Sequence, residues 1–94
     1  MSEIKVSRPH YATLKRARKG AERIADELGE EFGLDHAWEG NTLHFHRMGV
    51  EGHIEVSKKD VEVYVKLGFL LIGLRPRIEH EINRFCDENF GPVK

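Results

Sequence analysis

The sequence has one cysteine, three prolines and no long hydrophobic run. A single cysteine, Cys86, excludes an internal disulfide and a zinc site built from several cysteines. The longest apolar stretch, residues 67–74, has eight residues including two glycines, whereas a membrane-spanning helix needs about 20. The first ten residues contain no apolar core of a secretory signal. We therefore expect a cytoplasmic protein with no transmembrane segment.

The sequence also has no excess of charge of one sign, since 15 basic and 16 acidic residues give a formal net charge of −1. Proteins that bind nucleic acid through their overall charge usually have a pI above about 9, so nucleic-acid binding of that kind is not expected. The chain has 94 residues, of which 39% are hydrophobic and 33% charged. This length and composition predict a single folded domain over residues 1–94.

The N-terminal third predicts a strand followed by a helix. Ile4 and Val6 alternate with polar residues, which is typical of a short edge strand. Pro9 is placed to begin the helix, because proline is favoured in a first helical turn. Gly33 is placed to end it with a left-handed residue. Between them, apolar residues recur at helical spacings of three and four: Leu14, Ala17, Ala21, Ile24, Ala25, Leu28 and Phe32.

The middle of the chain predicts four antiparallel strands, at residues 35–39, 42–47, 50–56 and 61–67, joined by two-residue turns. These turns fix the register, because a slip of one residue would move every side chain to the other face. We expect Trp38 to be buried against the first helix. The turns make each facing pair apolar or glycine: Trp38 with Leu43, Leu43 with Ile54, Phe45 with Gly52, Ile54 with Val63 and Val56 with Val61.

Residues 75–90 predict a second helix, which Pro76 begins and Gly91 and Pro92 end. Its buried stripe comprises Ile78, Ile82, Phe85 and Cys86. The expected fold class is therefore α+β, in the order β-α-β-β-β-β-α. A single, mainly antiparallel sheet of four or five strands has two helices covering one face, and its other face is exposed to water.

Three histidines fall on the outer face of this sheet: His44, His46 and His53. Imidazoles so placed could bind Zn²⁺ or Ni²⁺. No fourth ligand at a suitable spacing accompanies them, so we expect polar residues on a solvated face and no bound cofactor. No nucleophile elbow, phosphate loop or pair of catalytic carboxylates is present in the sequence. We therefore expect no catalytic residues and no enzymatic activity.

The first helix carries a basic cluster in its N-terminal half: Lys15, Arg16, Arg18, Lys19 and Arg23. Its C-terminal half is mostly acidic, through Glu22, Asp26, Glu27, Glu30 and Glu31. This order opposes the helix dipole, so it does not stabilise the helix. A solvated helix face is the simpler interpretation, and contact with phosphate groups is the alternative.

The run at residues 67–74 is apolar without alternation, and two interpretations of it stay open. In one, the end of a strand passes under the second helix and places Phe69 and Leu71 in the core. In the other, Leu70, Ile72 or Leu74 face outward and form an association surface. The candidate interaction residues are accordingly Phe69, Leu70, Leu71, Ile72 and Leu74.

Several of these segments together resemble a family, the bacterial polyhydroxyalkanoic acid system proteins. The resemblance extends over nearly the whole chain. It is most specific in the segments WEGNTLHF and VKLGFLL, and includes RPRIEHEI in the second helix. These small proteins are encoded beside genes for polyhydroxyalkanoate synthesis or use, and some are found at the surface of storage granules.

The resemblance implies a non-enzymatic accessory protein that binds the granule, a granule-associated protein or a second copy of itself. It also implies a location in the cytoplasm, at the surface of polymer granules. It transfers no catalytic or ligand-binding residue to this chain. Two other functions remain open from the residues alone. One is a small metal- or ligand-binding module on the histidine face, and the other is a phosphate-contacting regulator using the basic half of the first helix.

Overall fold

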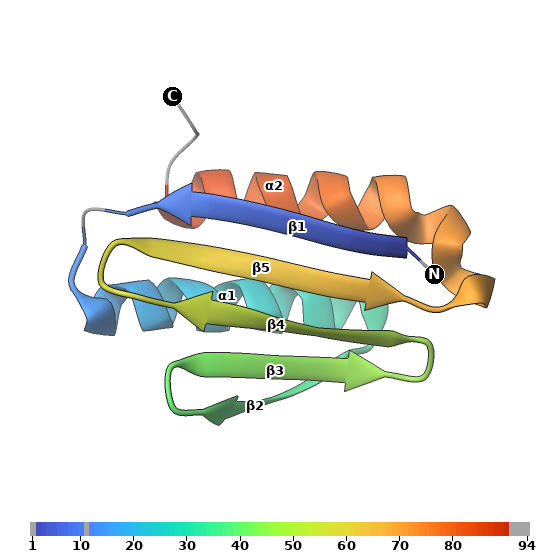
Figure 1. Cartoon of the computed structure of the whole chain (residues 1–94), viewed down its shortest axis with the longest axis horizontal. Helices are drawn as coiled ribbons and strands as arrows, with labels where there is room; N and C mark the ends of the chain where they lie inside the picture. The colour runs from blue at the N-terminus through green and yellow to red at the C-terminus, as the bar shows by residue number, and fades with distance from the viewer. Residues whose placement is uncertain (1, 11, 91–94) are drawn as a thin grey trace.

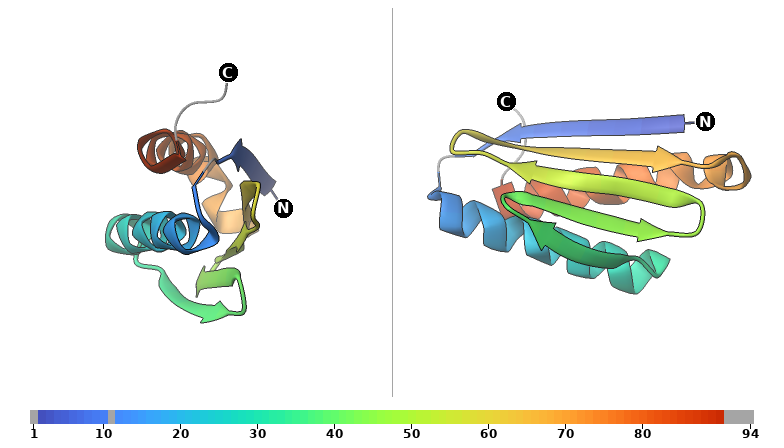
Figure 2. Two further views of the ribbon diagram at one scale, coloured as in Figure 1. Left: turned by 90° about the vertical axis from the view of Figure 1, so that its left-hand side faces the viewer. Right: turned by 60° about the horizontal axis from the view of Figure 1, so that its bottom comes forward.

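A computed structural model describes residues 2–10 and 12–90 and has one antiparallel sheet with both helices on the same face (Figures 1 and 2). The strands are β1 (Ser2–Pro9), β2 (Asp35–Glu39), β3 (Thr42–Arg47), β4 (Val50–Val56) and β5 (Asp60–Leu67). The helices are α1 (Leu14–Phe32), α2 (Arg75–Phe90) and a short 3₁₀ helix, η1 (Phe69–Leu74). The five strands are ordered β1-β5-β4-β3-β2. The expected fold class and element order are confirmed.

The register predicted from the three turns is also confirmed. Leu43 lies opposite both Trp38 and Ile54, and Phe45 lies opposite Gly52. Further along the sheet, Ile54 faces Val63 and Val56 faces Val61. These pairs form the inner face of the sheet, on which the two helices pack.

The helices present the predicted stripes to the core. Ala17, Ala21, Ile24 and Leu28 of α1 are buried, and α1 ends at Gly33 in a left-handed conformation with φ of 70°. In α2, the buried residues are Ile78, Ile82, Phe85 and Cys86. Burial raises the pKa of the Cys86 thiol to about 11, as expected for a structural cysteine rather than a reactive one. The predicted stop at Gly91 and Pro92 lies outside the described residues.

The start of the chain differs from the prediction. β1 runs to Pro9, so Pro9 ends a strand and does not begin α1. All eight residues of β1 pair with β5, from Ser2 opposite Leu67 to Pro9 opposite Asp60. A proline is tolerated there because β1 is an edge strand. The helix begins at Leu14, and the Thr13 side chain caps it by accepting a hydrogen bond from the Arg16 amide at 3.2 Å.

The arginine on the inner face of β1 explains why this strand was predicted too short. Arg8 is buried beside Ile4 and Val6, where the alternating pattern calls for an apolar residue. Its Nη2 donates to Asn83 Oδ1 at 2.9 Å and to Asp87 Oδ1 at 3.1 Å. Both partners belong to α2, so Arg8 connects the edge strand to the second helix.

Trp38 is only partly buried, which corrects the expectation of a core tryptophan. Its ring packs at the margin of the core because β2 is the other edge strand. The Arg18 guanidinium of α1 lies 4.4 Å from the centre of the indole ring and covers it from solvent. Such a cation–π contact stabilises the pair modestly at an exposed site.

Replacing Trp38 with alanine is therefore expected to cost about 1–2 kcal/mol, less than the roughly 3–5 kcal/mol of a fully buried tryptophan. The facing residue Leu43 is fully buried, and Leu43→Ala should cost more, about 2–5 kcal/mol. Urea unfolding followed by circular dichroism measures both values. A loss for W38A equal to or larger than that for L43A would contradict the shallow placement of the ring.

Candidate functional site

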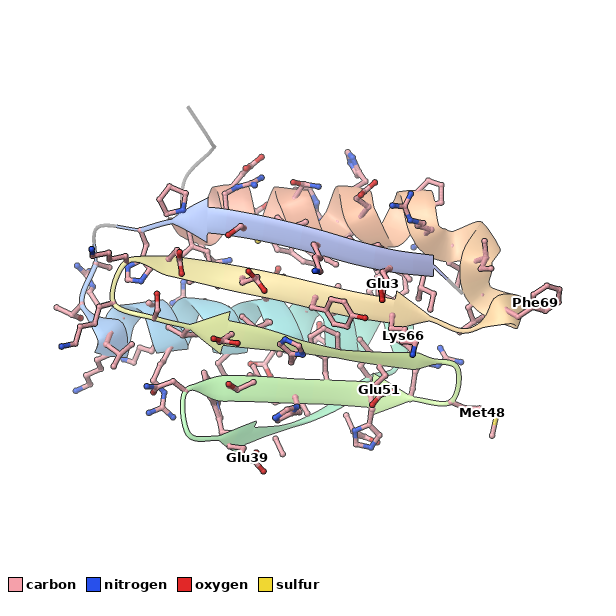
Figure 3. The ribbon with its side chains drawn as sticks, viewed as in Figure 1. Glu3, Glu39, Met48, Glu51, Lys66 and Phe69 are labelled. Carbon is pink, nitrogen blue, oxygen red and sulfur yellow. The ribbon has the colours of Figure 1, made fainter. Side chains whose placement is uncertain are left out.

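Large apolar side chains are exposed at one end of the long axis of the molecule. Met48 in the β3–β4 turn is 92% exposed, Phe69 of η1 is 81% exposed and Ile72 of η1 is 38% exposed. Figure 3 shows Met48 and Phe69 projecting outward at the same end of the sheet. We call Met48, Phe69 and Ile72 the apolar end. Side chains of this size are usually covered, and a group of them marks a candidate association surface.

The apolar end is held by contacts between the β3–β4 turn and the segment that follows β5. The Gly68 amide donates to the Gly49 carbonyl at 2.8 Å. Gly49 has a φ of 85°, and a Cβ there would lie 2.9 Å from Leu71 Cδ1. A glycine at this position thus allows both the tight turn and the close approach of Leu71. The two segments form one surface although they are about 20 residues apart in the sequence.

The 3₁₀ geometry decides which residues of the apolar run face outward. In a 3₁₀ helix, side chains three residues apart lie on the same side. Phe69 and Ile72 are accordingly exposed, whereas Leu71 and Leu74 are partly buried against the core.

Each interpretation of the run was right in part, because Leu71 packs against the core and Ile72 faces outward. Phe69 does not lie in the core, and Leu74 does not face freely outward. The side chain of Leu70 lies outside the described residues. Met48 was not predicted as part of a surface, although a large apolar residue in a two-residue turn beside glycine was a usable signal.

The outer face of the sheet carries the histidines where the register placed them. His44 lies opposite His53 with ring centres 6.1 Å apart, and His53 stacks on Tyr64 at 5.3 Å. His46 lies opposite Glu51 on the same face. Within residues 2–10 and 12–90, no cluster of three or more His, Cys, Asp or Glu side chains is placed to hold a metal ion.

Tyr64 ends this row of rings and is tied to the neighbouring edge strand. Its hydroxyl donates to Glu3 Oε2 at 2.7 Å. This hydrogen bond raises the pKa of Tyr64 above its usual value, because the carboxylate favours the protonated phenol. The interaction links β5 to β1 on the solvent side, and it has the features of a cross-strand contact of the sheet.

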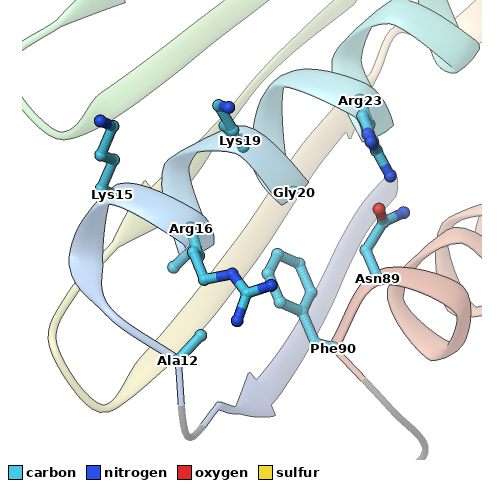
Figure 4. Close-up of a pocket in the computed structure, with 9 residues that line it drawn as sticks. Ala12, Lys15, Arg16, Lys19, Gly20, Arg23, Asn89 and Phe90 are labelled. Atoms are coloured by element: carbon cyan, nitrogen blue, oxygen red, sulfur yellow. The ribbon is translucent and has the colours of Figure 1, made fainter.

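The basic cluster of α1 lies beside a pocket formed with the end of α2. The pocket has a volume of about 510 Å³. Gly20 and Phe90 form part of its wall, and Asn89 of α2 lies at its edge (Figure 4). Of the five basic residues predicted as a cluster, four line this pocket and one does not. The residues that line this pocket are Lys15, Arg16, Lys19 and Arg23, whereas Arg18 points to Trp38.

No helix among the described residues is both long and apolar enough to cross a membrane.

The comparisons with known proteins identify the family. No curated protein and no solved structure matches the chain. A family model described as "Putative polyhydroxyalkanoic acid system protein" matches residues 4–90, which is nearly the whole chain. The chain therefore belongs to the family of polyhydroxyalkanoic acid system proteins.

Proposed function

We propose that this chain is a non-enzymatic accessory protein of the polyhydroxyalkanoate system, which associates with the surface of polymer granules through the apolar end. The observation that carries the proposal is that Met48 and Phe69 project from one tip of the molecule, with Ile72 exposed in the same 3₁₀ helix as Phe69. The family match supplies the setting, because it connects the chain with the polyhydroxyalkanoate system.

The chemistry of the apolar end suits a hydrophobic surface such as that of a polyester. Fully burying a side chain the size of Phe or Met is worth roughly 1.5–3 kcal/mol. Leu71 and Leu74 of η1 pack against the core, so Phe69 and Ile72 are presented by an ordered segment. Little conformational entropy is then lost on binding, which strengthens association.

The polar surroundings of the apolar end explain why such a protein stays dispersed when it is not attached. Arg47 and Glu51 flank the β3–β4 turn, and both are exposed. The Arg47 guanidinium donates to the Phe32 carbonyl at 2.7 Å, which fixes its position beside the turn. A small apolar area with a polar rim is typical of a reversible association surface.

Co-sedimentation with purified polyhydroxyalkanoate particles tests the proposal. Phe69→Glu and Met48→Glu each remove apolar contact and add a charge that must lose water on binding. We expect each variant to bind about tenfold more weakly, and the double variant more weakly still. Because both side chains are exposed, circular dichroism should show an unchanged fold.

Ala37→Glu is the matched control, because it adds the same charge at an exposed position on the outer face of β2. It should bind the particles as the unmodified chain does. If the Phe69 and Met48 variants keep full affinity, the apolar end is not the attachment surface. If the control loses affinity equally, added negative charge alone explains the loss.

A further inference from the structure

The pocket between α1 and α2 is lined by four cations and by no carboxylate among the residues that the structure describes. This is unusual in a chain whose acidic residues outnumber its basic ones, 16 to 15. Figure 4 shows Arg16 extending alongside the Phe90 ring, and Arg23 extending toward Asn89. Lys15 and Lys19 of the same helix also line the pocket, but in Figure 4 their charged ends extend away from Phe90. Glu22 of α1 does not line this pocket; it lines a neighbouring one beside Trp38, together with Lys15, Arg18 and Lys19.

The pocket cations have no ion-pair partner among the described residues, unlike four of the other arginines. Arg8, Arg75, Arg77 and Arg84 each lie within 4.0 Å of a carboxylate oxygen. None of the ion pairs in residues 2–10 and 12–90 involves Lys15, Arg16, Lys19 or Arg23. Four like charges on two helical turns repel one another, and an anion in the pocket would relieve that repulsion.

The pocket has an apolar wall as well as a charged one. The wall depends on Gly20, because a Cβ at this position would lie 2.8 Å from two atoms of the Phe90 ring. The absence of a side chain thus lets the ring lie against the α1 backbone. The Asn89 amide donates to the Phe85 carbonyl at 2.8 Å, which fixes its orientation and leaves its oxygen as an acceptor.

We infer that this pocket binds a small organic phosphate, with the phosphate held by Arg16 and Arg23 and the organic part against Phe90. Guanidinium groups match the geometry and charge of phosphate oxygens. The volume of about 510 Å³ is in the range of small-molecule sites, roughly 300–1,000 Å³. The site rests on side chains and not on the helix terminus, because Thr13 already accepts the hydrogen bond of the Arg16 amide.

Calorimetric titration with phenyl phosphate and with inorganic phosphate tests both walls of the pocket. Phenyl phosphate carries an apolar ring and a phosphate, so it should bind the unmodified chain at least fivefold more tightly than inorganic phosphate. The double variant Arg16→Gln/Arg23→Gln should bind phenyl phosphate at least tenfold more weakly. In Phe90→Ala, the two probes should bind with nearly equal affinity.

Arg18→Gln is the matched control, because it removes the same charge from the same half of α1 but lies outside this pocket. Its affinity for phenyl phosphate should stay within twofold of that of the unmodified chain. Circular dichroism checks folding. If the double variant does not fold, the single variants Arg16→Gln and Arg23→Gln, both at exposed positions, replace it and should each weaken binding at least threefold. If Phe90→Ala does not fold, the comparison of the two probes on the unmodified chain still tests the apolar wall.

Three results would overturn the inference. The first is no binding of phenyl phosphate at millimolar concentration. The second is an equal loss in Arg18→Gln and in the double variant, which would show a diffuse charge effect. The third is tighter binding of a DNA duplex than of phenyl phosphate, with a steep dependence on salt, which would identify a nucleic-acid patch. None of these results depends on the apolar end, so the two proposals can fail separately.

Discussion

Replacing Gly52 with alanine is expected to destabilise the domain by about 3 kcal/mol, because its Cβ would have the closest contact of those at the described glycines. A Cβ at this position would lie 2.3 Å from the Tyr64 carbonyl oxygen and 2.7 Å from Cε1 of Phe45. The carbonyl belongs to the backbone of the neighbouring strand, and Phe45 is fully buried. Neither can move without disturbing the sheet or the core, so the strain cannot be relieved locally.

Thermal unfolding measures this effect. A loss of about 3 kcal/mol lowers the melting temperature of a domain of this size by more than roughly 10 °C. Gly73→Ala is the control, because no atom lies within 4 Å of a Cβ built there and its φ is not positive. We expect G73A to melt within about 3 °C of the unmodified chain. A similarly small shift for G52A would show that β4 and β5 are more loosely packed than described.

The second large loss of stability is expected at the ion pair of the buried Arg8. Removing its partner Asp87 should cost more stability than removing Arg8 itself. Asp87→Ala should cost about 2–3 kcal/mol, because it leaves the charge of Arg8 with only the neutral Asn83 as a side-chain partner. The Arg8 side chain is 10% exposed, so water cannot replace the lost carboxylate. Its Nε is already buried without a hydrogen-bond partner, and removing Asp87 adds to that penalty.

Arg8→Met should cost less than about 1 kcal/mol. It removes the buried charge and places an apolar side chain next to Ile4 and Val6, while the freed Asp87 side chain is 47% exposed and can be hydrated. Urea unfolding at neutral pH gives both values. The double variant should resemble R8M, because without Arg8 the Asp87 carboxylate has little left to stabilise. If R8M lowers the free energy of unfolding more than D87A does, the ion pair itself stabilises the fold.

The sheet register could be read from the sequence because it follows from local rules. Short turns fix which residues face each other, and only one register places Phe45 opposite Gly52 on a continuous apolar face. The helix stripes are equally local, since spacings of three and four define one side of α1. In each case the relevant residues lie close together in the chain.

The features that were missed depend on residues far apart in the chain. In the sequence, Arg8 interrupts the alternating pattern of a strand. Its buried position is explained only by Asp87 of α2, which is 79 residues away in the chain. The pocket likewise requires Phe90 to meet Gly20, and only the antiparallel packing of the two helices brings them together (Figure 1). The apolar end combines a turn with a 3₁₀ helix whose three-residue period differs from the periods of strands and α-helices.

The position of the apolar end at a tip has a consequence for how densely the protein can coat a surface. The molecule measures 38 × 29 × 21 Å, and the tip lies at one end of its longest dimension. A chain attached by this tip stands upright and occupies a footprint of 29 × 21 Å, whereas one lying flat would occupy 38 × 29 Å. Roughly twice as many copies then fit on the same area. The N-terminal half of α1 and the end of α2 lie at the opposite tip (Figure 1), which in this upright arrangement would face the surrounding water.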